Sequence, residues 1–201
     1  SSIKPDFIVN CIGVLIKGSK NEANAIYLNS YLPHRLKDLA EEFNSKLIHI
    51  STDCVFSGKI GKYIETDHRD GKGVYSTSKT LGEVIDDHNL TIRTSIIGPE
   101  FKANGEGLFD WFMRQDKDIS GYTDHLWSGV TTLELAKAIK WFIDHDLTGI
   151  YHITNNLPIT KYSLLKLFSK HTGKSVKIEA VAGVKVDKSF IDTRLCLDYG
   201  I

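Results

Sequence analysis

Residues 51–58 are Ser51-Thr52-Asp53-Cys54-Val55-Phe56-Ser57-Gly58, and they follow the mainly apolar run 46–50. An apolar run that ends in hydroxyl residues predicts a buried strand that stops at a loop. Tyr75-Ser76-Thr77-Ser78-Lys79 begins 23 residues after Thr52, at the predicted start of the next helix. The hydroxyl residues are therefore expected at the carboxyl end of a strand, and the Tyr–Lys pair on the helix that leads to the following strand.

Strands and helices alternate on both sides of these two motifs. Apolar residues from Asn21 to Phe43 recur at helical spacing, and Pro33 is expected to kink or break that helix. Strands that alternate with crossover helices are typical of a parallel sheet. We therefore predict an α/β fold with a Rossmann-like, doubly wound parallel sheet, from strands at 7–13, 46–52 and 90–98 and helices at 21–43 and 75–87.

Composition excludes several classes of partner. The chain has 201 residues, of which 25 are Lys or Arg and 25 are Asp or Glu, so its formal net charge is zero. This balance argues against nucleic acid and against a polybasic membrane surface, and no run reaches the roughly 18 apolar residues of a membrane span. Three separated cysteines favour the reducing cytoplasm. The eight histidines form no pair at i, i+3 or i, i+4, so no metal site is predicted.

Tyr75 and Lys79 are the strongest candidates for chemistry. Four residues apart on a helix, they share one face, and an ammonium beside a phenol is expected to lower the phenol pKa from about 10 toward neutrality. Such a Tyr can exchange a proton with a carbonyl or carbinol oxygen, which a hydroxyl from Thr52 can hold in place. The set suits hydride transfer between a nicotinamide and a sugar-like alcohol or ketone.

Tyr-x-x-x-Lys alone is a weak signal. Both residue types are common on amphipathic helices, where the pair is usually a buried ring beside a solvated ammonium. The combination is more specific, because Ser51-Thr52-Asp53 precedes the pair at a strand end and another strand follows the helix. This is the context that such a motif requires.

The chain resembles the extended short-chain dehydrogenase/reductases, and more closely the dTDP-4-dehydrorhamnose reductase family of nucleotide-sugar reductases. The combination of STDxVFSG with YxxSKxxGE is the most specific part of the resemblance, which covers nearly the whole chain. The matching stretches are 5–11, 51–58, 63–67, 75–83, 92–95 and 128–136.

The resemblance implies a role for each candidate residue. Thr52, Tyr75 and Lys79 would be catalytic, with Tyr75 as the acid and Lys79 also binding the nicotinamide ribose. The cofactor would be NADPH or NADH, bordered by Tyr75, Lys79, Cys11, Ile12, Gly13 and Ile50. The nucleotide-sugar substrate would contact Thr52, Asp53 and Ile96, and the protein is a possible homodimer.

Two positions depart from the family pattern. An aromatic residue usually follows the STD triplet and a Trp follows the RTS strand, whereas this chain has Cys54 and Ile96 there. The substrate pocket is therefore expected to differ. Trp127 is either an aromatic surface for the substrate or a packing residue under a loop. Asn29 is a candidate for ordering a water beside Lys79, as an Asn on this helix does in related reductases.

The beginning of the fold is the largest departure. A dinucleotide-binding domain is expected to begin with a strand, a Gly-rich turn and a helix that holds the pyrophosphate, but residues 1–201 contain no GxxGxxG. We expect about 60 or more residues ahead of Ser1. Residues 1–98 would then be the C-terminal part of a Rossmann-like NAD(P)-binding domain. Residues 99–201 would mainly form a smaller C-terminal α/β substrate lobe, with some segments returning to the Rossmann sheet.

The predicted function is NAD(P)H-dependent reduction of a 4-keto nucleotide-sugar in polysaccharide precursor synthesis. A nucleotide-sugar epimerase or dehydratase is the nearest alternative, although a dehydratase is expected to have Glu where Cys54 stands. A non-catalytic regulatory relative that binds a dinucleotide is the other alternative. The presence of Thr52, Tyr75 and Lys79 together favours an enzyme.

Overall fold

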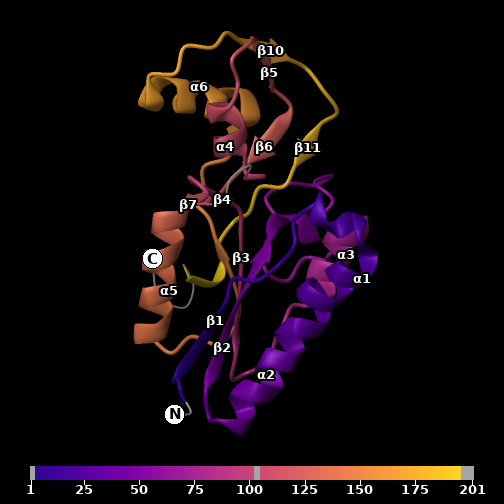
Figure 1. Cartoon of the computed structure of the whole chain (residues 1–201), viewed down its shortest axis with the longest axis vertical. Coiled ribbons are helices and arrows are strands. Elements are labelled where there is room, and N and C mark those ends of the chain that lie inside the picture. The colour runs from indigo at the N-terminus through magenta and orange to yellow at the C-terminus, as the bar shows by residue number, and fades with distance from the viewer. Residues whose placement is uncertain (1–2, 102–104, 196–201) are drawn as a thin grey trace.

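A four-stranded parallel sheet forms the centre of the molecule (Figure 1). The computed structural model describes residues 3–101 and 105–195. The strand order is β1-β2-β3-β8, and the strands are β1 (Phe7–Asn10), β2 (Lys46–Thr52), β3 (Leu90–Thr94) and β8 (Gly149–Ile153). Thr52 lies opposite Thr94, and Asn10 lies opposite His49, so the carboxyl ends of the strands share one edge. The predicted α/β class with a Rossmann-like parallel sheet is confirmed.

Helices cover both faces of this sheet. A run of short elements leads into α2 (Leu32–Glu42), which lies with α3 (Val74–Leu81) on one side, while α5 (Thr132–Asp144) lies on the other (Figure 1). The run comprises η1 (Gly18–Lys20), α1 (Glu22–Ala25) and η2 (Ile26–Tyr31). The core under α5 is built from Ile48, Ile92, Phe142 and Tyr151, and Leu47 packs with Ala40 and Val84 on the opposite face.

Pro33 does not break the predicted helix. The chain turns as a π-helix over η2 and continues directly into α2, with Pro33 in the first turn of α2. Proline has no backbone N–H, so it cannot donate to the carbonyl of Asn29 four residues earlier. A π-helical turn ahead of the proline accommodates this lost hydrogen bond. The predicted break at Pro33 is therefore wrong, and a π-helical turn lies just ahead of the proline instead.

Three predicted elements are shorter than expected. The strand predicted at 7–13 ends at Asn10. Helix α3 ends at Leu81, because Gly82 is its C-cap and a Cβ at that position would overlap the Asn29 carbonyl. The strand predicted at 90–98 divides after Thr94, and β4 (Ile96–Ile97) pairs instead with β7 (Val130–Thr131).

The remaining elements form a smaller lobe above the sheet (Figure 1). Its core joins Phe112 of α4 (Leu108–Met113) to Leu164, Leu165 and Phe168 of α6 (Lys161–Thr172). Two small sheets accompany these helices: β5 (Ile119–Tyr122) pairs with β10 (Ile178–Val181), and β6 (His125–Trp127) lies between β11 (Val186–Asp187) and β9 (Ile159–Thr160).

Within the described ranges, no helix has both the length and the apolar character that crossing a membrane requires.

Candidate active site

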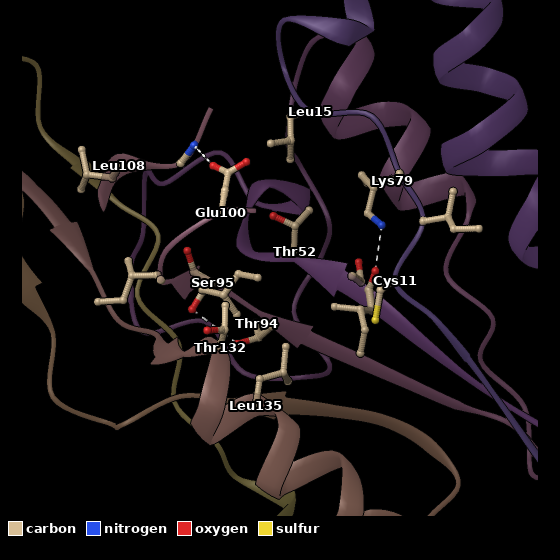
Figure 2. Close-up of a pocket in the computed structure, with 18 of the residues that line it drawn as sticks. Cys11, Leu15, Thr52, Lys79, Thr94, Ser95, Glu100, Leu108, Thr132 and Leu135 are labelled. Atoms are coloured by element: carbon tan, nitrogen blue, oxygen red, sulfur yellow. Dashed lines mark hydrogen bonds between the residues drawn. The ribbon is translucent and has the colours of Figure 1, made fainter. Parts of the chain in front are cut away.

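A cavity of about 430 Å³ lies at the carboxyl ends of β1, β2 and β3 (Figure 2). The sheet side contributes residues 11–15, 50–52 and 94–95, and α3 contributes Tyr75 and Lys79. Glu100 and Leu108 line the cavity on the side of the lobe, and Thr132 and Leu135 line it from α5. The predicted strand-end motifs and the Tyr–Lys helix therefore meet around one cavity.

Lys79 projects from α3 toward the end of β2. Its Nζ donates to the Ile50 carbonyl at 2.8 Å, and only 6% of the residue is exposed (Figure 2). Burial lowers the pKa of Lys79 to about 8, although the charges of Glu83 and Cys11 act in the opposite direction. The ammonium is therefore mostly protonated at neutral pH and fixed at the cavity wall.

The predicted lowering of the Tyr75 pKa is wrong. Burial raises the pKa of Tyr75 well above its usual value, and a hydrogen bond with the Thr52 hydroxyl offsets only part of the rise. The physical reason is that the ammonium of Lys79 donates to the Ile50 carbonyl rather than to the phenol. A phenol with a raised pKa stays protonated at neutral pH, which suits a proton donor.

Thr52 ends β2 and begins the short η3 helix (Asp53–Val55). Its Oγ1 accepts from the backbone N–H of Cys54 at 3.2 Å and donates to Asp53 Oδ1 at 3.1 Å. These bonds hold the hydroxyl at the cavity wall beside Tyr75. Asp53 lies directly behind Thr52 and is not among the residues that line the cavity.

Asn29 connects the loop after β1 to α3. Its Oδ1 accepts from the N–H of Val14 at 2.9 Å, and its Nδ2 donates to the Val14 carbonyl and to Ser78 Oγ, both at 3.1 Å. The side chain is fully buried and does not line the cavity. A Cβ at position 13 would lie 3.0 Å from Asn29 Oδ1. The hydrogen bonds of Asn29 therefore require a glycine at position 13 or a small shift of the neighbouring atoms.

Trp127 lies outside the main cavity. Its Nε1 donates to Ser95 Oγ at 2.7 Å, and its ring packs against the core of the lobe. It lines a separate, mainly apolar hollow with Leu157 and Leu164. These contacts of the Trp127 side chain support the second of its two predicted roles, packing in the lobe.

Eight of the predicted site residues line the cavity: Cys11, Ile12, Gly13, Ile50, Thr52, Tyr75, Lys79 and Ile96. Sequence reasoning missed Glu100, Leu108 and Thr132, which also line it. Gly98-Pro99 after β4 was the available signal, because it marks a turn that brings Glu100 back toward the strand ends.

A buried ion-pair network supports the site from behind. Arg93 of β3 donates from Nε and Nη2 to the two carboxylate oxygens of Glu83, at 2.8 and 2.9 Å. Ser51 Oγ and Arg69 Nη1 donate to the same carboxylate at 2.7 and 2.9 Å. The network ties the segment that follows α3 to β2 and β3. It thereby supports α3, which carries Lys79, and β2, which carries Thr52.

A family model described as the RmlD substrate binding domain matches residues 1–189. The chain belongs to this family. Among curated RmlD-family relatives, the spore coat polysaccharide biosynthesis protein SpsK of Bacillus subtilis is 26% identical over 185 residues, which cover 89% of this chain and 65% of that protein. The dTDP-4-keto-6-deoxy-D-glucose reductase of Streptomyces niveus is 25% identical over 175 residues, which cover 82% of this chain and 60% of that protein. The chain thus spans less than two thirds of the length of these relatives.

Solved structures have the same fold as this RmlD-family chain. The hypothetical dTDP-4-dehydrorhamnose reductase of Sulfolobus tokodaii superposes with a TM-score of 0.82 at 25% identity, covering 94% of this chain and 72% of that one. The dTDP-4-dehydrorhamnose reductase of Bacillus anthracis, solved in complex with NADP, superposes with a TM-score of 0.86 at 22% identity, covering 98% and 75%. At 22% identity, the similarity to the Bacillus anthracis structure supports only the fold.

Proposed function

We propose that the whole protein reduces a 4-keto nucleotide-sugar with NADPH or NADH, as a dTDP-4-dehydrorhamnose reductase does, in the synthesis of polysaccharide precursors. The observation that carries the proposal is the meeting of Thr52, Tyr75 and Lys79 around one cavity at the strand ends. Membership of the RmlD family and the names of the relatives, two of which are a dTDP-sugar reductase and a spore coat polysaccharide protein, support it.

The cavity suits the nicotinamide end of a dinucleotide. Cys11, Ile12 and Gly13 present backbone and small or apolar side chains, and Ile50 forms the floor beside the Lys79 ammonium. A Cβ on Gly13 would lie 3.9 Å from Lys79 Nζ, so the absence of a side chain leaves this corner open. These residues would hold the nicotinamide and its ribose, and the cofactor would supply a hydride to the substrate carbon.

Tyr75, Thr52 and Lys79 would divide the proton chemistry. Tyr75 donates its phenolic proton to the carbonyl oxygen as that oxygen gains negative charge, which its raised pKa permits at neutral pH. The Thr52 hydroxyl donates a hydrogen bond to the same oxygen and holds it toward Tyr75. The Lys79 ammonium lies at the cavity wall, where its charge stabilises the phenolate left on Tyr75.

The substrate is proposed to enter between the sheet and the lobe. Ile96, which lines the cavity, and Asp53, beside Thr52, are proposed contacts for the sugar. Asn29 and Trp127 are proposed to act through their neighbours: Asn29 through the Val14 loop, and Trp127 through Ser95. Residues 1–98 are proposed to belong to the dinucleotide-binding domain and residues 99–201 mainly to the substrate lobe.

We further propose a cytoplasmic enzyme, supported by the free thiols of Cys11 and Cys54 within the described residues. The homodimer stays a prediction.

The test is a reductase assay on the whole protein with a dTDP-4-keto-6-deoxy sugar and NADPH or NADH. We expect oxidation of the cofactor to match formation of the 4-hydroxy sugar mole for mole. Binding of the cofactor without turnover of any 4-keto sugar would instead favour the non-catalytic regulatory relative. Loss of water from the sugar, or inversion without net oxidation of the cofactor, would favour a dehydratase or an epimerase.

A further inference from the structure

Lys188 follows β11 and reaches the segment that carries Thr52. Its Nζ lies 3.4 Å from Cys54 Sγ, although the two residues are 134 positions apart in the sequence. In the part of the chain that the structure describes, this thiol is the one hydrogen-bond partner of the ammonium, and no carboxylate forms an ion pair with it. A half-buried cation with a weak, uncharged partner is costly unless a ligand supplies a better one.

The backbone around Lys188 is firmly tied to the loop after η3. The N–H of Asp187 donates to the Gly58 carbonyl at 2.8 Å, and the N–H of Tyr63 donates to the Ser189 carbonyl at 2.9 Å. Phe190, two residues further on, is fully buried against Phe56. The backbone at Lys188 is therefore fixed by its neighbours, so binding a ligand at this lysine would require little further ordering of the backbone.

Lys188 lies beside the segment that carries Thr52, and neither Lys188 nor Cys54 is among the residues that line the cavity. Cys54 donates its backbone N–H to Thr52 Oγ1, and the Thr52 hydroxyl lies beside the Tyr75 phenol, so the three residues are close neighbours. Cys54, Tyr75 and Lys188 are all partly exposed. Burial raises the pKa of Cys54 to about 11, so at neutral pH the thiol is uncharged and does not neutralise the ammonium.

The other buried cations near the site are already paired. Arg93 and Arg69 both donate to the carboxylate of Glu83. Lys79 donates to the Ile50 carbonyl within the cavity. Among the partly or fully buried cations that the structure describes near Thr52 and Tyr75, Lys188 is therefore the one without an anionic or carbonyl partner, and it can bind an oxygen-rich, negatively charged molecule.

We propose that Lys188 binds the nucleotide-sugar directly, by donating to a phosphoryl or hexose oxygen. This inference rests on the proposed reductase function and adds a substrate-binding residue from the far end of the chain. Phosphoryl and hexose oxygens accept the same ammonium hydrogen bond, so the experiment has to separate them. Lys188 takes no part in the proton transfer.

The experiment compares Lys188→Met and Lys188→Arg in the whole protein, with Lys185→Met as the control. Lys185 is an exposed lysine three residues earlier on the same segment. A hydrogen bond to a charged group contributes about 1.5–3 kcal/mol, so Lys188→Met is expected to raise the KM for the nucleotide-sugar about 10- to 100-fold. Because the contact binds substrate and transition state alike, kcat is expected to change less than about threefold. Lys188→Arg is expected to recover most of the affinity, and Lys185→Met to leave KM unchanged.

Calorimetric binding of the nucleoside diphosphate alone identifies the oxygen. A similar loss of affinity for the diphosphate in Lys188→Met assigns the contact to phosphate, and a rise in KM without that loss assigns it to the hexose. If the wild-type protein reduces the 4-keto sugar and neither quantity changes in Lys188→Met, the inference is overturned and the reductase proposal stands. If the wild-type protein reduces no 4-keto sugar, the reductase proposal fails. The diphosphate titration then tests Lys188 by itself. Equal affinity of the wild type and Lys188→Met for the diphosphate overturns the proposed role of Lys188.

Discussion

Replacing Glu83 with Gln tests the network that supports the site. The Glu83 side chain is completely buried, Arg93 is 2% exposed, and the carboxylate accepts from Ser51, Arg69 and Arg93. Glu83→Gln keeps the shape but leaves the guanidinium of Arg93 buried without its counter-charge. Removing one partner of a buried pair costs about 3–5 kcal/mol, and we expect the free energy of unfolding to fall by that amount.

Urea denaturation of the purified protein measures this loss, with Glu134→Gln as the matched control. Glu134 pairs with Lys137 on the exposed face of α5, where both side chains are more than half exposed, at 54% and 62%. Exposed pairs contribute about 0–1 kcal/mol, so the control is expected to be nearly neutral. A loss below about 1 kcal/mol in Glu83→Gln would show that the network does not stabilise the fold as its geometry implies.

The same pair predicts a pH dependence of stability. Burial alone would raise the pKa of Glu83, but the hydrogen bonds and charge of Arg93, with Ser51 and Arg69, outweigh it and lower the pKa. A carboxyl with a lowered pKa in the folded state stabilises the protein above its unfolded pKa of about 4.3, and this contribution is lost as the pH falls through the folded value. Glu83→Gln is therefore expected to flatten the acid limb of the stability curve.

Two further predictions concern the cavity and the lobe. Reductase activity is expected to fall as the pH rises through about 8, because the Lys79 ammonium then loses the proton that stabilises the phenolate; a pH profile of kcat/KM that stays flat to pH 10 would contradict this role. Trp127→Phe is expected to lower stability by about 1 kcal/mol through its lost hydrogen bond to Ser95, with only a small rise in the KM for the sugar because Trp127 reaches the cavity only through Ser95; a large rise in KM at unchanged stability would instead make Trp127 a substrate contact.

The main elements could be predicted because their boundaries have local causes. Strand β2 has the predicted bounds 46–52, since its apolar run ends in hydroxyl residues. Helix α6 likewise has local boundaries at 161 and 172, because Thr160 caps its beginning and Gly173, with φ of 70°, ends it. The chemistry of these boundaries lies within a few residues of sequence.

The parts that the sequence did not reveal depend on contacts between distant segments. Strands β7 and β11 have two residues each, too few for any periodicity. The early end of α3 at Leu81 is set by the close approach of Asn29 to Gly82. The Tyr75 pKa is raised because the phenol is buried and the Lys79 ammonium donates to the Ile50 carbonyl instead, which spacing along a helix does not show.

The turnover of Tyr75→Phe tests the central claim most directly, because this variant removes only the phenolic oxygen that would donate the proton. With a 4-keto nucleotide-sugar and NADPH or NADH, general acid catalysis typically contributes about 10²–10⁴-fold, so kcat is expected to fall at least a hundredfold. The control is Tyr122→Phe on the exposed face of β5, which is expected to keep full activity. Near-normal turnover by Tyr75→Phe would contradict the assignment of this cavity as the active site.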